Sequence, residues 1–228
     1  MTTIASPHHV PEQTNFAIIP AAFASWLSGF ALAPSFLKII RASVLVLNLL
    51  LPFTLSAKDT PRAILSGLPD TIADCKHGEI EDYGDPRLGC SVDYAMPGLL
   101  ITIYVYDQGR RRIADGITDS LVTQSFAMAK ADIQTAVTRG MYSGAKLESD
   151  GKVSHDGGFE TLSARYYLTR EQEPDTGLKM FSEIHIFGAR DHIIKIRVSG
   201  EKSREAELGK IVDQFIPAFV SALGVPKR

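Results

Sequence analysis

Apolar and polar residues alternate along several segments of the chain, which is the pattern expected of half-buried β-strands. The clearest segment is residues 99–106, LLITIYVY, which is rich in β-branched and aromatic side chains. Because successive strand side chains point to opposite faces, its odd-numbered apolar residues share one face and its two tyrosines share the other. Weaker patterns predict further strands at residues 90–94, 146–155, 159–169, 179–187 and 193–198.

Two other segments carry apolar residues at the spacing of an amphipathic helix. The first spans residues 120–139 and is followed by Gly140, a residue type that commonly ends helices. The second spans residues 201–223 and contains Pro217. Since proline lacks the backbone donor and crowds the preceding turn, we expect a kink or break near Asp213.

The order of these elements is β-β-α-β-β-β-β-α, with turn residues between consecutive strands. Strands joined by short turns pair antiparallel, so the pattern excludes a doubly wound nucleotide-binding fold. The sequence therefore predicts an α+β fold in which one curved antiparallel sheet is packed against two helices. We place this single domain at residues 89–228 and interpret the polar residues 58–88 as an irregular connecting segment.

The element order and size of residues 90–223 resemble the PsbP-like group of α/β sandwich proteins. That group contains the extrinsic P subunit of the oxygen-evolving photosystem, a nuclear import factor that binds Ran, and small bacterial envelope proteins. Its members are mostly non-catalytic binding or assembly factors. The resemblance therefore implies a binding or accessory role, although a fold alone does not define an activity.

Composition and motifs narrow the function classes further. Apolar residues make up 45% of the chain, charged residues 22%, and the net charge is −2, so no basic field points to nucleic acid. The chain contains no P-loop, dinucleotide-binding glycine motif, H-E-x-x-H, EF-hand loop or G-x-S-x-G elbow. We therefore assign no catalytic residue, metal ligand or cofactor from the sequence.

Residues 37–57, LKIIRASVLVLNLLLPFTLSA, have the organisation of a signal peptide. Lys38 and Arg41 form a short basic region, and residues 42–51 form an apolar region too short to span a bilayer. Small residues follow, and cleavage after Ala57 is preferred over cleavage one residue earlier. This segment predicts an exported protein that is periplasmic or secreted.

Residues 1–36 precede the predicted signal peptide and leave two interpretations open. If translation starts at Leu37, the product has an ordinary secretory opening and residues 1–36 are not part of it. Alternatively, residues 16–37 are an uncharged stretch of 22 residues, long enough for a membrane span. In that case the same domain is anchored to the inner membrane through an uncleaved N-terminal segment.

The chain has only two cysteines, Cys75 and Cys90. Two cysteines this close in an oxidising compartment usually pair, so the predicted export favours a Cys75–Cys90 disulfide. A bridge there would close a loop of about 16 residues and stabilise the domain by roughly 3 kcal/mol in the chain-entropy model.

A contact surface is predicted from strand alternation. If the apolar residues of each strand face the helices, the polar and aromatic residues between them face outward together. Tyrosine and arginine are favoured at binding surfaces because they combine contact area with hydrogen-bonding ends. The residues assigned to this surface are Tyr104, Tyr106, Arg165, Tyr167, His185 and Arg197.

Two functional hypotheses follow. The first is a non-enzymatic binding or accessory protein of the envelope or the secreted fraction, with an unknown protein or small ligand as its partner. The alternative is a hydrolase-type enzyme whose site has no recognisable motif. A cavity with converging titratable groups would favour the enzyme, and a shallow sheet face would favour binding.

We expect N-terminal sequencing of the mature protein to begin at Lys58, or at Ala57 if the peptidase cuts one residue earlier. The basic region, the apolar region and the small residues after them are the features that the peptidase recognises. An intact Met1 in a soluble cytoplasmic fraction would contradict export.

Overall fold

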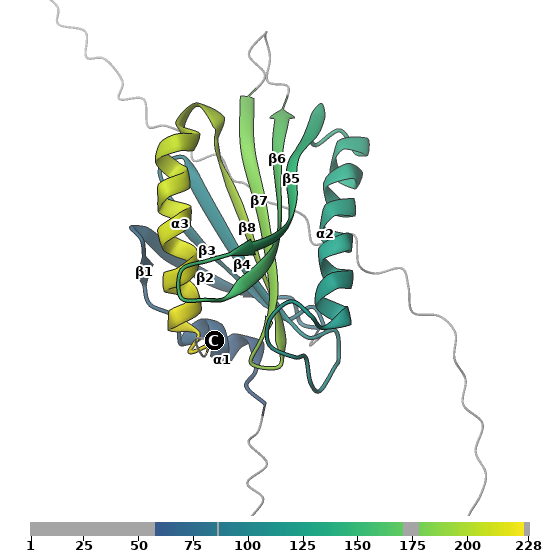
Figure 1. Cartoon of the computed structure of the whole chain (residues 1–228), viewed down its shortest axis with the longest axis vertical. Helices are drawn as coiled ribbons and strands as arrows, with labels where there is room; N and C mark the ends of the chain where they lie inside the picture. The colour runs from purple at the N-terminus through teal and green to yellow at the C-terminus, as the bar shows by residue number, and fades with distance from the viewer. Residues whose placement is uncertain (1–57, 86, 171–177, 226–228) are drawn as a thin grey trace, which may run out of the picture. The chain divides into compact units, whose positions relative to one another are not determined.

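The computed structural model describes residues 58–85, 87–170 and 178–225 (Figure 1). The predicted signal peptide at residues 37–57 and the segment before it lie outside these residues. Within the described part, no helix has the length and apolar character needed to cross a membrane.

The described residues form an eight-stranded antiparallel sheet and three α-helices. The helices are α1 (Pro61–Ser66), α2 (Ser120–Thr138) and α3 (Glu205–Ala222), and a 3₁₀ turn, η1 (Lys202–Arg204), directly precedes α3. The strands are β1 (Thr71–Ile72), β2 (Cys75–Asp82), β3 (Cys90–Met96), β4 (Leu99–Tyr106), β5 (Gly144–Ser154), β6 (Glu160–Arg170), β7 (Leu178–Ala189) and β8 (His192–Glu201). Their order in the sheet is β1-β2-β3-β4-β8-β7-β6-β5, which confirms the predicted α+β fold with an antiparallel sheet.

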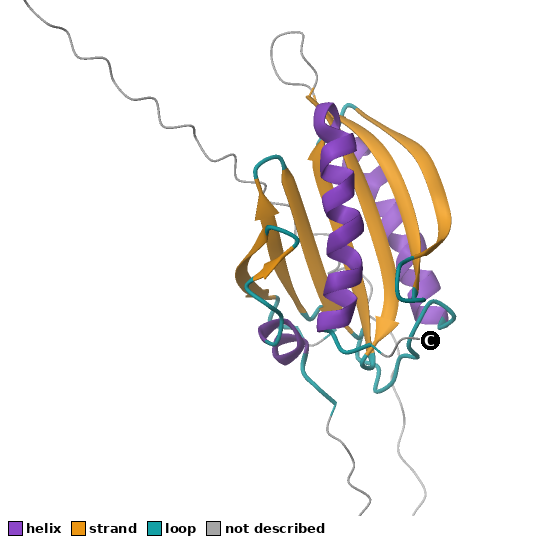
Figure 2. Cartoon of the chain, turned by 60° about the vertical axis from the view of Figure 1, so that its left-hand side comes forward, coloured by secondary structure: helices purple, strands orange, loops and turns teal. Residues whose placement is uncertain are grey.

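Helices α2 and α3 cover opposite faces of this sheet (Figures 1 and 2). On one face, here called the α3 side, α3 and α1 pack mainly on β1–β4 and β8. On the other face, here called the α2 side, α2 packs on β5–β7, and Ile193 of β8 belongs to the same cluster. Each helix therefore covers only part of its own face.

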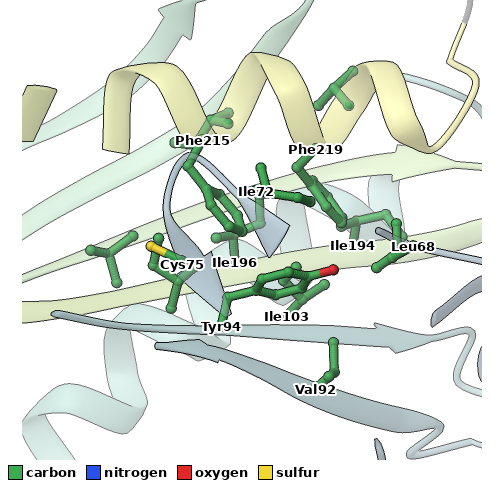
Figure 3. Packing of buried hydrophobic residues seen from close by; sticks show 14 of the residues in the cluster. Leu68, Ile72, Cys75, Val92, Tyr94, Ile103, Ile194, Ile196, Phe215 and Phe219 are labelled. Atoms are coloured by element: carbon green, nitrogen blue, oxygen red, sulfur yellow. The ribbon is translucent and has the colours of Figure 1, made fainter. Parts of the chain in front are cut away.

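The core on the α3 side is built around the apolar stripe of α3 (Figure 3). Phe215 and Phe219 are fully buried, and their stacked ring centroids lie 6.2 Å apart. Tyr94 of β3 meets Phe215 edge-on with centroids 5.2 Å apart, and its hydroxyl donates a 2.6 Å hydrogen bond to the carbonyl oxygen of Pro69. Because a buried phenol needs a polar partner, this bond also holds the connection between α1 and β1 against the core.

The second core, on the α2 side, buries the other face of the same central strands. Val122 and Phe126 of α2 pack in a cluster with Ile184 and Ile186 of β7. Every residue of β7 from 181 to 189 is consequently buried. A strand covered on both faces has no need of strict alternation, which explains the weak pattern of this segment.

Residues 58–88 are not the irregular segment that the sequence predicts. Thr60 caps α1 by accepting a 3.1 Å hydrogen bond from the backbone N–H of Ala63, and Pro61 takes the first helical position, where its missing N–H costs nothing. Strand β2 pairs with β3 and extends the sheet. Its sequence, CKHGEIED, does not show the apolar alternation of a strand, because most of its side chains are exposed and polar. The domain therefore begins near residue 58 and not at residue 89.

Of the kink or break predicted in the C-terminal helix, the break does not occur. Helix α3 continues through Pro217 to Ala222. Proline removes the hydrogen bond to the carbonyl of Asp213, but Asp213 is exposed, so water can satisfy that carbonyl. The burial of the apolar stripe outweighs the loss of one backbone bond.

The structure also contradicts the predicted disulfide. Cys90, which begins β3, pairs with Asp82 at the end of β2, whereas Cys75 begins β2 beside Lys76, the partner of Ala95. Seven residues of strand therefore separate the two positions, about 23 Å at 3.3 Å per residue, whereas a disulfide needs Cα atoms within about 7 Å. Both cysteines are free and buried, and burial raises the pKa of Cys75 to about 11.

Two glycines between β2 and β3 allow the energetic cost of backbone strain to be distinguished from that of a steric clash. Gly84 and Gly89 have nearly the same φ, +69° and +70°. A Cβ at Gly84 would meet nothing within 4 Å, whereas at Gly89 it would lie 1.9 Å from the carbonyl oxygen of Val105. We expect Gly84→Ala to cost about 1–2 kcal/mol of unfolding free energy, the cost of the left-handed backbone alone, and Gly89→Ala to cost clearly more in urea denaturation. Equal losses would contradict the close contact between the β2–β3 loop and β4.

Candidate functional site

The six residues of the predicted contact surface lie on two faces of the sheet. Cross-strand pairing puts Arg165, Tyr167 and His185 on the α3 side, whereas Tyr104, Tyr106 and Arg197 lie on the α2 side. The prediction of one shared face is therefore wrong. The apolar residues of β4 point toward α3, and those of β6 point toward α2. The assumption that apolar residues face one common core therefore assigns the outward residues of these two strands to opposite faces of the sheet.

On the α3 side, four side chains of β6, β7 and the β5–β6 turn form a hydrogen-bonded chain. Thr161 Oγ1 lies 3.0 Å from His155 Nε2 and 3.2 Å from His185 Nδ1, and His185 Nε2 lies 3.1 Å from Glu183 Oε2. A carboxylate only accepts, so His185 Nε2–H donates to Glu183, while Thr161 Oγ1 bridges the two imidazole rings. Each buried polar group in the chain is thereby satisfied.

The chain continues from Glu183 to the start of α3. Arg165 forms ion pairs with Glu183 and, at 3.2 Å, with Glu205 of α3. Glu205 also accepts hydrogen bonds from the hydroxyl of Tyr167 at 3.1 Å and from Lys202 of η1 at 3.3 Å. A single carboxylate at the first turn of α3 thus connects the helix to β6 and to η1.

The β5–β6 turn closes over this network. Figure 1 shows the turn end of the β5–β6 hairpin bending across the sheet toward α3. Phe159 stacks on His155 with ring centroids 4.7 Å apart and contacts Phe187 at 6.0 Å. Burial under this cover, with a smaller contribution from the neighbouring His185, lowers the pKa of His155 to about 4.

Glu183 stays ionised despite its burial. Burial by itself raises its pKa, but the hydrogen bond and charge of His185 together with the charge of Arg165 outweigh it and leave the pKa below its ordinary value. The carboxylate is 5% exposed and has partners on both oxygens. Substitution of either partner would therefore destabilise the fold, because it would leave a buried charge without compensation.

Thr161, His185 and Glu183 are the residue types of an acid–base relay, in the corresponding order. A substrate, however, has poor access to the Thr161 hydroxyl. Thr161 is 0% exposed, and its hydroxyl is held between two imidazole rings. A nucleophile must reach its substrate, so this arrangement favours a structural role for these hydrogen-bonded side chains. Among the residues that the structure describes, no group of three or more His, Cys, Asp or Glu side chains is placed to hold a metal ion.

A cavity of about 420 Å³ lies at one end of this network. Three lysines, from β5, β7 and η1, line it together with Tyr167 and a floor of small and apolar residues on β5 and β6. The lining residues are Gly144, Ala145, Lys146, Tyr167, Leu168, Thr169, Lys179 and Lys202. Because Tyr167 and Lys202 also bind Glu205, the cavity and the network are continuous.

Strand alternation in the sequence predicts three members of this region, Arg165, Tyr167 and His185, but as part of an open surface. The structure places them in the network. Thr161 and Glu205 were missed. Glu205 belongs to a helix more than thirty residues away in sequence, so no local spacing could associate it with β6.

The comparisons with known proteins concern the fold only. No family model matches the chain, and no curated protein matches it. Among solved structures, the chain is similar to cyanobacterial PsbP from Synechocystis, with 13% identity and a TM-score of 0.40 over 61% of this chain and 79% of that one. It is also similar to a protein of unknown function from Pseudomonas aeruginosa, with 12% identity and a TM-score of 0.30 over 66% of this chain and 88% of that one. PsbP belongs to the group that the element order resembles, and likenesses of this degree carry no argument about activity.

The pH dependence of stability tests the buried position of His155. Its pKa of about 4 lies below the ordinary value of 6.5, so the folded state favours the neutral ring. The stabilising contribution is complete above pH 6.5 and is lost as the pH falls toward 4, because the unfolded chain takes up a proton first. We expect the unfolding free energy of the wild type to fall more steeply between pH 6.5 and 4 than that of His155→Gln. Parallel curves would show that His155 is not buried in the network.

Proposed function

We propose that this protein is an exported, non-enzymatic binding or accessory protein, and that the cavity on β5–β7 takes its ligand or a side chain of its protein partner. The observation that carries the proposal is a cavity of about 420 Å³ that lies open on the face of the sheet, with Tyr167 and three lysines but no histidine or carboxylate among its lining residues. That volume lies within the range of small-ligand pockets, roughly 300–1,000 Å³, in which a few polar groups fix the orientation of the ligand.

The cavity offers hydrogen-bond donors and few acceptors. Lys202 is paired with Glu205, and Lys146 lies 3.5 Å from Glu148, whereas Lys179 forms no ion pair with another described residue. An ammonium group donates up to three hydrogen bonds and accepts none. The complementary ligand is therefore one with acceptor oxygens, such as a carbonyl, carboxylate or sulfonate group.

Binding is favoured over hydrolysis by where the polar groups lie. The residues that line the cavity include no histidine, cysteine or serine. The alternative of a hydrolase is supported by the hydrogen-bonded order Thr161–His185–Glu183, but the buried Thr161 does not line the cavity. A hydrolase would need the hairpin above Thr161 to open before a substrate could reach the hydroxyl.

Export rests on the segment at residues 37–57 alone. We propose a periplasmic or secreted location, with anchoring through an uncleaved N-terminal segment as the alternative. The N-terminal sequence of the mature protein distinguishes the two.

A charge reversal in the cavity tests the binding proposal. The probe is 8-anilinonaphthalene-1-sulfonate, which carries a sulfonate for the lysines and an apolar ring for the floor, and its fluorescence is titrated to saturation. We expect Lys179→Glu to weaken this binding about tenfold, which corresponds to about 1.4 kcal/mol. Lys179 is exposed, so the melting temperature should stay within the range of ordinary surface substitutions.

Lys210→Glu is the matched control, since Lys210 is an exposed lysine of α3 that does not line the cavity. It makes the same change in net charge, so it accounts for any general electrostatic effect. Equal weakening by both substitutions, or weakening by neither, would refute the cavity as the binding site.

A further inference from the structure

Two cations of β8 share the α2 side of the sheet, on the face opposite to the cavity. Lys195 and Arg197 are two positions apart, so their side chains point to the same face, and their Cα atoms are about 6.6 Å apart. Their neighbours on β4 are Tyr104 and Thr102, respectively. Both cations are partly buried at the boundary between the half of the face that α2 covers and the half that is open.

Neither cation has a carboxylate partner among the described residues. The ammonium of Lys195 lies over the ring of Tyr104, 4.1 Å from its centroid. One terminal nitrogen of Arg197 donates to the hydroxyl of Tyr142 at 3.2 Å, and its Nε–H is buried without a hydrogen-bond partner. Buried donors are nearly always satisfied in folded proteins, so an orphaned guanidinium donor requires an explanation.

On the α3 side, by contrast, a partly buried cation that stabilises the fold has carboxylate partners. Arg165 is paired with two carboxylates there, Glu183 and Glu205. On the α2 side the charged groups near the pair include Asp132 of α2, Asp93 of β3 and Glu81 of β2. Arg170 of β6 is also near, with its guanidinium 5.7 Å from the ring centroid of Tyr142. None of these carboxylates forms an ion pair with Lys195 or Arg197 in the described residues.

The cations are consequently held at an energetic disadvantage. Burial lowers the pKa of Lys195 to about 8; Asp132 opposes this shift, and the positive charge of Arg197 adds to it. Two like charges on neighbouring positions destabilise each other unless an anion lies between them. Two hydroxyl-bearing residues of β4, Tyr104 and Thr102, are the cross-strand neighbours of the pair, and the hydroxyl of Tyr142 accepts from Arg197.

We propose that Lys195 and Arg197, together with Tyr104, form a binding site for the phosphate group of a small ligand. A phosphate carries about −1.5 to −2 charges near pH 7 and so matches two cations, whereas a single carboxylate would leave one of them uncompensated. A guanidinium and an ammonium with unused donors are the groups that bind phosphate oxygens in proteins. This site lies on the other face from the cavity, and its failure would leave the proposed function untouched.

Isothermal titration calorimetry of the full chain with inorganic phosphate at constant ionic strength tests the site. We expect saturable binding with one site, weakened at least tenfold in Lys195→Met and in Arg197→Gln, and unchanged in the control Lys210→Gln. Both substitutions remove a partly buried cation that has no carboxylate partner among the described residues, so the variants should melt close to the wild-type temperature when phosphate is absent. If Lys195→Met does not fold, the folded Arg197→Gln decides by the same criterion.

Proton uptake supplies a second, independent readout. A bound anion favours the charged form of Lys195, so its pKa rises and the protein should take up protons on binding phosphate at pH 8. Titrations in buffers of different ionisation enthalpy measure that uptake, which should vanish in Lys195→Met. Absence of phosphate binding, or binding equal in all variants, overturns the proposal. Acetate binding as tight as phosphate, with the same loss in both variants, overturns the assignment to phosphate.

Discussion

Strands β7 and β8 are buried on both faces, and the rest of the structure depends on that constraint. A sheet that is covered on one face needs one apolar set per strand, whereas these two strands supply apolar residues to two separate cores. Ile194 and Ile196 of β8 belong to the α3 side, while Ile193 belongs to the α2 side with Ile184 and Ile186 of β7. Because α2 and α3 draw on the same central strands, neither helix can be displaced without exposing them.

The double cover also determines where polar groups must be neutralised. On the α3 side, the helix does not reach across β6 and β7, and the β5–β6 turn closes the remaining space. The polar side chains enclosed there form one network from His155 to Lys202, in which Glu183 and Glu205 share Arg165. Since buried charges are costly without partners, this network holds the hairpin, the sheet and the first turn of α3 in one arrangement.

The two faces of the sheet therefore differ in how their cationic side chains are paired. The cations of the α3 side are largely paired with glutamates, and a cavity opens where the pairing ends at Lys179. On the α2 side, Lys195 and Arg197 lie beside an aromatic ring and have no carboxylate partner in the part of the chain that the structure describes. Internal pairing of charges on the α3 side stabilises the fold, whereas these two cations are the basis of the proposed phosphate site.

Alternation along the sequence was sufficient for the elements that contact one core. Strand β4 was predicted with its observed bounds, and the helix at residues 120–139 was predicted to within one residue, because each has one buried face and one open face. Strand β2 was missed because most of its residues are polar and exposed. The face to which each strand turns its apolar residues, the separation of Cys75 from Cys90, and the meeting of Arg165 with Glu205 depend on strand order and on helices covering opposite faces. Local periodicity specifies which residues of one strand lie together, but only the packing of the whole sheet decides which strands place them on the same side.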